Sequence, residues 1–154
     1  KNWIICELES SLLLFSTNIS RESSKIISQQ SQNVKLKKNL QLDSMHKLKE
    51  EAIKFKESLL KGDFEDMVKT LRKGWESKKN SAKSVSNNYL DEIYNCAIEA
   101  GALAGKVSGA GGGGFMMFYV PFNKRVNLIN ELNRFDGNVS NCHFTNKGCQ
   151  AWYC

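Results

Sequence analysis

Five glycines within six residues constrain this chain more than any other feature of its sequence. Residues 109–114 read GAGGGG and lead directly into residues 115–120, FMMFYV, which have the composition of a β-strand. Glycine alone visits positive φ freely, and each glycine costs about 0.5–1 kcal/mol relative to alanine in regular structure. The segment therefore predicts a tight loop whose glycines serve either close packing or the binding of a ligand.

The surroundings of this loop exclude three common uses of a glycine-rich pattern. The spacing satisfies G-x-G-x-x-G, but the loop precedes a strand, whereas a dinucleotide-binding turn opens a helix. It ends in Gly-Phe instead of the Gly-Lys-Ser/Thr of a Walker loop. No H-R-D or D-F-G sequence follows, so a protein kinase is excluded as well. Successive glycine N–H groups remain suited to an anion, and close strand packing remains the alternative.

Composition narrows the class of protein further. The chain has 154 residues, enough for one domain, and a net charge of +6, which favours an anionic partner such as nucleic acid or a phosphorylated metabolite. The lysines are scattered, as on a solvated helix face.

The five cysteines and two histidines lack the spacing of a zinc site, so we expect no metal ligands among them. We expect the thiols to be reduced, as in a cytoplasmic protein. No apolar run approaches the length of a membrane span, and the first residue, Lys1, suggests a piece of a longer protein.

Hydrophobic periodicity and capping residues predict the order of elements. We expect strand structure within residues 3–16 and helices over residues 21–32 and 43–61, the second capped by Asp43 and ended by Gly62. A further helix starts at Asp63, another near Asn87, and another after Asn123. Later strands are expected over residues 115–120, 139–145 and 149–153. This order predicts an α+β fold in which helices pack on one face of an antiparallel sheet.

Several stretches resemble one enzyme family. Residues 106–115, KVSGAGGGGF, resemble the third signature of the GHMP small-molecule kinases, which include galactose, homoserine, mevalonate and phosphomevalonate kinases. Residues 7–23, 75–79 and 148–152 are similar to the D-glycero-D-manno-heptose phosphate kinases of that family, although Asn18 stands where their pattern usually has glycine. Together these stretches extend over nearly the whole chain.

The resemblance implies both a fold and an activity. It implies that residues 1–154 form the ferredoxin-like C-terminal domain of a kinase, and that the N-terminal ATP-binding domain is missing from the chain. The parent enzyme would use ATP and magnesium to phosphorylate the anomeric hydroxyl of D-glycero-D-manno-heptose 7-phosphate, in the synthesis of nucleotide-activated heptose. The catalytic acid and the magnesium ligands of the family lie in the other domain. We therefore expect no catalytic residue here and no kinase activity from this chain alone.

The same resemblance suggests where ligands approach. The loop expected beside the nucleotide phosphates consists of Ser108, Gly109, Ala110, Gly111, Gly112, Gly113 and Gly114. The residues expected to bind the sugar phosphate are Arg21, Lys78 and Lys106. Each has a structural alternative: a solvated arginine for Arg21, a helix-end cation for Lys78, a local ion pair for Lys106 and a turn hydroxyl for Ser108.

Three other functions remain open at this stage. The chain could belong to another GHMP sugar kinase, such as a fucose- or galactose-type enzyme, or be a non-catalytic binding or regulatory module of the same fold. A basic nucleic-acid-binding domain ranks last. Strand alternation places Phe115 and Phe118 on opposite faces, so they cannot form one base-stacking surface. We expect neither a nucleic-acid nor a membrane partner.

Overall fold

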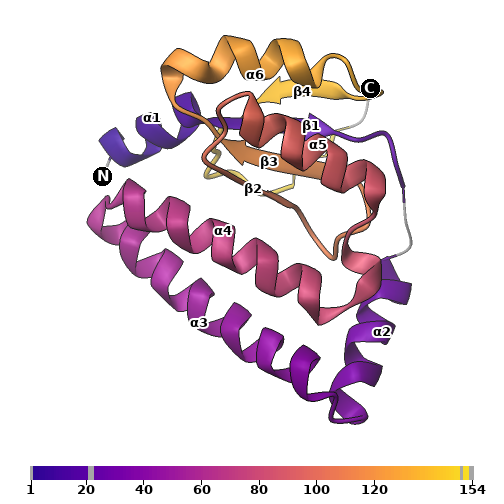
Figure 1. The fold of residues 1–154 in the computed structure, drawn as a ribbon. Helices are drawn as coiled ribbons and strands as arrows, with labels where there is room; N and C mark the ends of the chain where they lie inside the picture. The colour runs from indigo at the N-terminus through magenta and orange to yellow at the C-terminus, as the bar shows by residue number, and fades with distance from the viewer. Residues whose placement is uncertain (1, 21–22, 150, 153–154) are drawn as a thin grey trace.

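A four-stranded antiparallel sheet organises the chain, and four helices occupy the long connection between its first two strands (Figure 1). The computed structural model describes residues 2–20, 23–149 and 151–152. Its elements are α1 (Asn2–Ser11), β1 (Leu12–Ser16), α2 (Ser23–Lys35), α3 (Asn39–Lys61), α4 (Phe64–Ser81), η1 (Lys83–Val85), α5 (Asn88–Glu99), β2 (Ala104–Val107), β3 (Phe115–Tyr119), η2 (Phe122–Lys124), α6 (Arg125–Leu132) and β4 (Asn138–Asn141).

The strand order confirms the predicted fold class. The strands lie in the order β2-β3-β1-β4, and every neighbouring pair is antiparallel. With α2 to α5 between β1 and β2, and α6 between β3 and β4, the chain follows the split β-α-β pattern of ferredoxin-like domains. Phe15 of β1 pairs with Met116 of β3 on one side and with Val139 of β4 on the other. The α+β, ferredoxin-like expectation is therefore correct.

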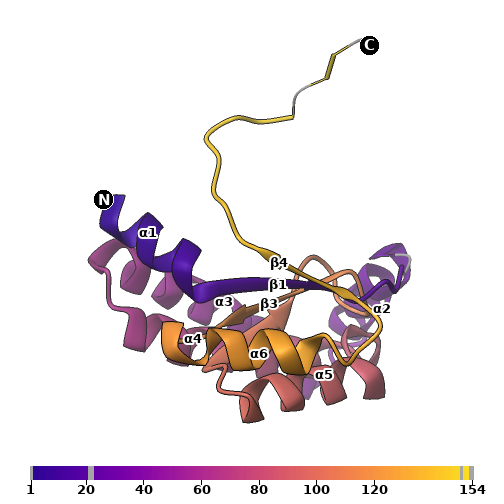
Figure 2. The same cartoon turned by 90° about the horizontal axis from the view of Figure 1, so that it is seen from above.

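The main core lies between one face of the sheet and helices α5 and α6, which lie on the same side in Figure 2. Strand alternation sends Leu13 and Phe15 of β1, with Met116 and Phe118 of β3, into this layer, and all four are fully buried. Trp75 of α4 enters the same core. Its ring centroid lies 6.2 Å from that of Tyr94 on α5. Trp75 is thus a core residue, and it is almost fully buried.

A smaller apolar cluster forms on the other face of the sheet. Leu12 and Tyr119 are buried there together with Ile4 and Leu8 of α1 and Met67 of α4. In the middle of this face Leu14 and Met117 remain half-buried. This face is therefore less completely covered than the first, and it borders the candidate site described below.

The first predicted strand is partly wrong. Residues 2–11 form helix α1, and strand structure starts only at Leu12. Ile4 and Leu8 are buried one helical turn apart, whereas Trp3 and Ile5 are exposed. The spacing of four residues therefore decided the outcome over the β-propensity of the Trp-Ile-Ile run.

Helix boundaries were predicted with mixed success. Gly62 ends α3 with φ of 78°, and the Asp63 carboxylate accepts a hydrogen bond of 3.0 Å from the Asp66 N–H at the start of α4, both as expected. By contrast, α3 begins at Asn39, so Asp43 lies inside it and does not cap it. Helix α6 begins at Arg125 after a short turn, and Asn123 does not cap it.

The strands near the C-terminus are shorter than predicted, and one strand was missed. β4 ends at Asn141 instead of residue 145, and Cys149 lies in no strand. The remainder of the predicted return strand falls partly on residues 150 and 153, outside the described residues. Strand β2, Ala104–Val107, was not predicted at all. Within the described residues, no helix is long and apolar enough to span a membrane.

Candidate functional site

The glycine segment, residues 109–114, connects β2 to β3 and is anchored at two distant points of the chain. The Gly112 N–H donates to the Val85 carbonyl at 2.7 Å, and the Gly114 N–H donates to the Ile19 carbonyl at 2.9 Å. In return, the Gly114 carbonyl accepts hydrogen bonds from both the N–H and the Oγ1 of Thr17, each at 2.9 Å. These contacts fix the segment between the end of β1 and the turn η1.

Two of the glycines are required by packing. A Cβ on Gly111 would lie 2.7 Å from the Val85 carbonyl oxygen, and a Cβ on Gly113 would lie 2.6 Å from that of Ile19. Both glycines also have positive φ, of 113° and 154° respectively. At these positions the packing explanation for the pattern is correct.

The other side of the segment is open. A Cβ on Gly109 or Gly114 would meet nothing within 4 Å, and both residues are exposed. Among the described residues, the backbone N–H groups of Gly111 and Gly113 have no hydrogen-bond partner, whereas that of Gly112 is bound to Val85. Gly113 is buried and Gly111 is half-buried, so of these two unpaired donors that of Gly111 is the more accessible to a phosphate.

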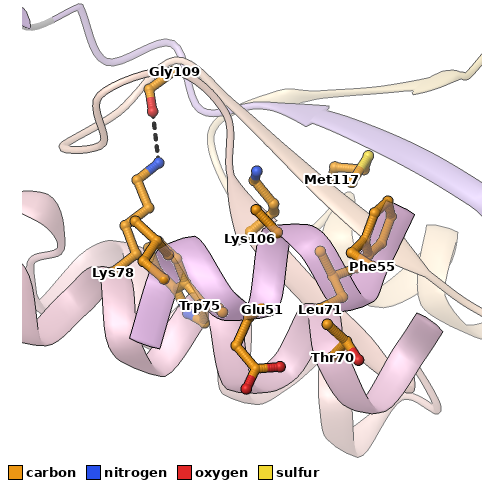
Figure 3. Close-up of a pocket in the computed structure, with 12 residues that line it drawn as sticks. Glu51, Phe55, Thr70, Leu71, Trp75, Lys78, Lys106, Gly109 and Met117 are labelled. Carbon is orange, nitrogen blue, oxygen red and sulfur yellow. Dashed lines mark hydrogen bonds between the residues drawn. The ribbon is translucent and has the colours of Figure 1, made fainter. Parts of the chain in front are cut away.

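Lys78 links α4 to the beginning of this segment. Its Nζ donates to the Gly109 carbonyl at 2.6 Å and to the Val107 carbonyl at 3.1 Å (Figure 3). Burial of the side chain, followed by the positive charge of Lys106, lowers the pKa of Lys78 from 10.5 to about 8. At neutral pH the amine is still mostly protonated.

The other predicted site residues lie in different situations. Lys106 is half-buried on β2 and forms no ion pair or hydrogen bond with the described part of the chain, so the local ion pair considered for it is absent there. Ser108 is exposed, and its backbone N–H donates to the Phe115 carbonyl at 2.8 Å. Its hydroxyl has no partner among the described residues. Arg21 lies outside the described residues, so its predicted role is not addressed.

A pocket of about 460 Å³ lies beneath the open side of the segment. Helices α3 and α4 form its walls, and Lys106 of β2, Met117 of β3 and Gly109 complete it. The labelled side chains in Figure 3 place the nitrogen atoms of Lys78 and Lys106 at the glycine end of the pocket, and the Glu51 carboxylate at the opposite end. The pocket thus carries positive charge where it meets the loop.

The sequence did not identify the rest of the pocket lining. The apolar lining includes Phe55, Leu71 and Met117, which look from sequence like ordinary core residues. One carboxylate oxygen of Glu51, Oε2, and the indole Nε1 of Trp75 are buried without a hydrogen-bond partner among the described residues. For Glu51 no sequence signal existed, because a glutamate on a lysine-rich helix usually faces solvent.

The site fits a phosphate group better than it fits a metal ion. The unpaired backbone N–H groups and the two lysines supply donors and positive charge, which suit the phosphates of ATP. Within residues 2–20, 23–149 and 151–152, no group of three His, Cys, Asp or Glu side chains could hold a metal ion.

Comparison with known proteins gives this arrangement a family. Residues 55–137 match the family described as GHMP kinases C terminal. The chain is 44% identical, over 152 residues, to the D-glycero-alpha-D-manno-heptose 7-phosphate kinase of Campylobacter jejuni; the match covers 99% of this chain and 44% of that protein. The chain thus spans less than half the length of this curated relative.

Solved structures agree with this match. The crystal structure of a D-glycero-D-manno-heptose 1-phosphate kinase from Bacteroides thetaiotaomicron is similar with a TM-score of 0.56 and 34% identity, over 91% of this chain and 34% of that one. The L. major mevalonate kinase, solved with R-mevalonate, has the same fold with a TM-score of 0.72 at 19% identity, over 80% of this chain and 37% of that one. The family match, which includes the pocket-lining helix α4 and the glycine segment, leads to one conclusion: the chain belongs to the GHMP kinases, as a C-terminal domain of that family.

Proposed function

We propose that this chain is the C-terminal part of an ATP-dependent sugar-phosphate kinase that phosphorylates the anomeric hydroxyl of D-glycero-D-manno-heptose 7-phosphate. The observation that carries the proposal is the open side of the glycine segment at Gly109, which lines the same pocket as Lys78 and Lys106. A transferred phosphoryl group needs concentrated positive charge and hydrogen-bond donors. The choice of sugar rests on the 44% identity to a heptose 7-phosphate kinase.

In this proposal the chain positions substrates and does not itself attack the phosphate. The N–H of Gly111, which has no partner among the described residues, donates to a phosphate oxygen, and the exposed Ser108 offers its hydroxyl. Lys106 supplies positive charge from β2. Arg21, at the expected start of the helix after β1, binds the phosphate that the sugar already carries. ATP supplies the phosphoryl group that is transferred.

The remaining components of the reaction come from outside the chain. We propose that an N-terminal domain binds most of the ATP, and that it contributes the catalytic acid and the magnesium ligands. The chain spans 44% of the C. jejuni relative, which leaves room for such a domain. The heptose product then enters the synthesis of nucleotide-activated heptose, and a cytoplasmic location remains a prediction.

The direct test is a kinase assay with the intact protein. ATP is offered with one sugar at a time, in separate reactions: heptose 7-phosphate, galactose or fucose. We expect transfer to heptose 7-phosphate, with a new phosphorus NMR signal coupled to the anomeric proton. Preferred transfer to galactose or fucose would assign the chain to another sugar kinase of the family. No transfer to any sugar would favour the binding-module alternative.

Two companion experiments test the division of labour. Residues 1–154 expressed alone should show no kinase activity, because the proposal assigns the catalytic acid and the magnesium ligands to the other domain. In the intact protein, Arg21→Ala should raise KM for the sugar phosphate far more than KM for ATP. Equal effects on the two KM values would remove Arg21 from the sugar-phosphate site.

A further inference from the structure

Lys78 is placed unusually for a lysine on the rim of a pocket. It lies in the last turns of α4, yet its Nζ donates two hydrogen bonds to backbone carbonyls at the start of the β2–β3 connection. Those carbonyls belong to Val107 and Gly109, the residues on either side of Ser108. One side chain therefore fixes the backbone immediately before and after Ser108.

The fixed stretch is the one that most needs support. Gly109 has φ of 69°, and a Cβ added there would meet nothing within 4 Å, so side-chain packing does not restrain this residue. The later glycines are restrained by Val85 and Ile19, but these anchors lie at the far end of the segment. At the near end, the Lys78 amine adds two hydrogen bonds to the one between the Ser108 N–H and the Phe115 carbonyl.

We propose that Lys78 is a positioning residue that holds Ser108 and the first turn of the glycine segment in the conformation that receives phosphate. Its third N–H has no partner among the described residues, and Lys78 lines the pocket, so the same amine also presents positive charge to a bound anion. This role replaces the direct sugar contact expected from the sequence. Its kinetic consequence rests on the proposed kinase function, whereas its structural consequence does not.

The charges around Lys78 are consistent with this role. Lys106 approaches from β2, and Glu51 of α3 lines the far end of the same pocket. No carboxylate forms a salt bridge with Lys78 in the described part of the chain. The ammonium is therefore satisfied by backbone carbonyls and not by an ion pair.

Hydrogen exchange in the intact protein tests the structural part without any assay of activity. Lys78→Met removes the donors but keeps the apolar stem, and Lys73→Met is the matched control, an exposed lysine on α4 without a partner among the described residues. We expect the Ser108 amide, whose N–H donates to the Phe115 carbonyl, to exchange at least about tenfold faster in Lys78→Met, because two hydrogen bonds from a charged donor to the flanking backbone are lost. Exchange in α5 should stay unchanged, and Lys73→Met should match the wild type.

Lys78→Met could speed exchange everywhere by lowering the stability of the whole domain. In that case Lys78→Arg provides the test of the positioning role. A guanidinium can donate to both carbonyls, so wild-type exchange of the Ser108 amide in Lys78→Arg supports the positioning role. Faster exchange there in Lys78→Arg overturns it. Exchange in Lys78→Met equal to that in Lys73→Met overturns it as well.

Kinetics of the intact enzyme then separate positioning from substrate binding. A positioning role predicts that Lys78→Met lowers kcat at least about tenfold and leaves KM for the sugar phosphate within about twofold, with partial rescue by Lys78→Arg. A rise in KM at unchanged kcat would instead show direct substrate binding and overturn the proposal. Absence of kinase activity in the wild type would contradict the proposed function alone, because the exchange result stands independently.

Discussion

The two sides of the glycine segment use the same residue type for opposite reasons. Gly111 and Gly113 are glycine because carbonyl oxygens of Val85 and Ile19 occupy the space where a Cβ would lie. Gly109 and Gly114 have empty space around them, and only their positive φ favours glycine. The comparison shows that one compact motif combines a packing requirement with an accessible binding surface. The packed side holds the open side in place.

Gly111→Ala should produce the largest effect. The new Cβ would meet the Val85 carbonyl at 2.7 Å in a backbone conformation that alanine rarely adopts. We expect a loss of about 3 kcal/mol in the free energy of unfolding, measured by urea denaturation of the intact protein. A loss below about 1 kcal/mol in the free energy of unfolding would mean that the backbone around Gly111 accommodates a Cβ at low cost. Packing would then not distinguish Gly111 from Gly109.

Gly109→Ala should destabilise less and interfere with function more. Its Cβ meets nothing within 4 Å, so the cost is confined to the left-handed backbone conformation, about 1 kcal/mol. If the open side receives phosphate, kcat/KM should fall even in samples that remain fully folded. A fully active Gly109→Ala enzyme would separate the open side from ligand binding.

Thr17→Val probes the anchor at the Gly114 end of the glycine segment with little change in shape. It removes the bond from the Thr17 Oγ1 to the Gly114 carbonyl but leaves the one from the Thr17 N–H. Because the carbonyl keeps a donor, we expect a loss of about 1 kcal/mol in thermal or urea unfolding. A much larger loss would indicate that the hydroxyl organises the whole connection.

The smallest expected effect is a pH dependence from Lys78. Its pKa falls from 10.5 to about 8 in the folded protein, so between these values the unfolded chain binds more protons at this residue. The stability of the wild type relative to Lys78→Met should therefore be constant below pH 8 and rise from pH 8 to 10.5, by at most about 1 kcal/mol after solvent screening. A relative stability that falls over this range would contradict the burial of the amine.

The sequence predicted those elements whose signals are local. Gly62 and Asp63 mark the boundary between α3 and α4 through backbone conformation and capping, which depend on few neighbours. Strand β2 carries no such signal, because Ala104 and Gly105 have little β-propensity and pair only through their register with β3. Helix α1 was missed because a run of apolar residues suits a strand and a helix equally. What favours the helix is the packing of Ile4 and Leu8 against α4 and the sheet, which a sequence pattern does not show.

The candidate site divides in the same way. The glycine segment was identified from sequence because its pattern is dense and is followed by a strand. Lys78 was singled out as well, but its partners were not, since they are carbonyls about thirty residues away. Glu51 and Phe55 became pocket residues only when α3 packed beside α4. A single sequence does not specify such contacts between distant helices.

The position of β1 in the sheet has a consequence for biosynthesis. Residues 12–16 pair on one side with residues 115–119 and on the other with residues 138–141. At about 5–20 residues per second on the ribosome, this apolar strand waits roughly 5–20 s before its first partner exists. During that interval the nascent chain exposes an unpaired apolar segment that can aggregate. We therefore expect the yield of folded protein to depend on chaperones that shield Leu12 to Phe15 until translation passes β3.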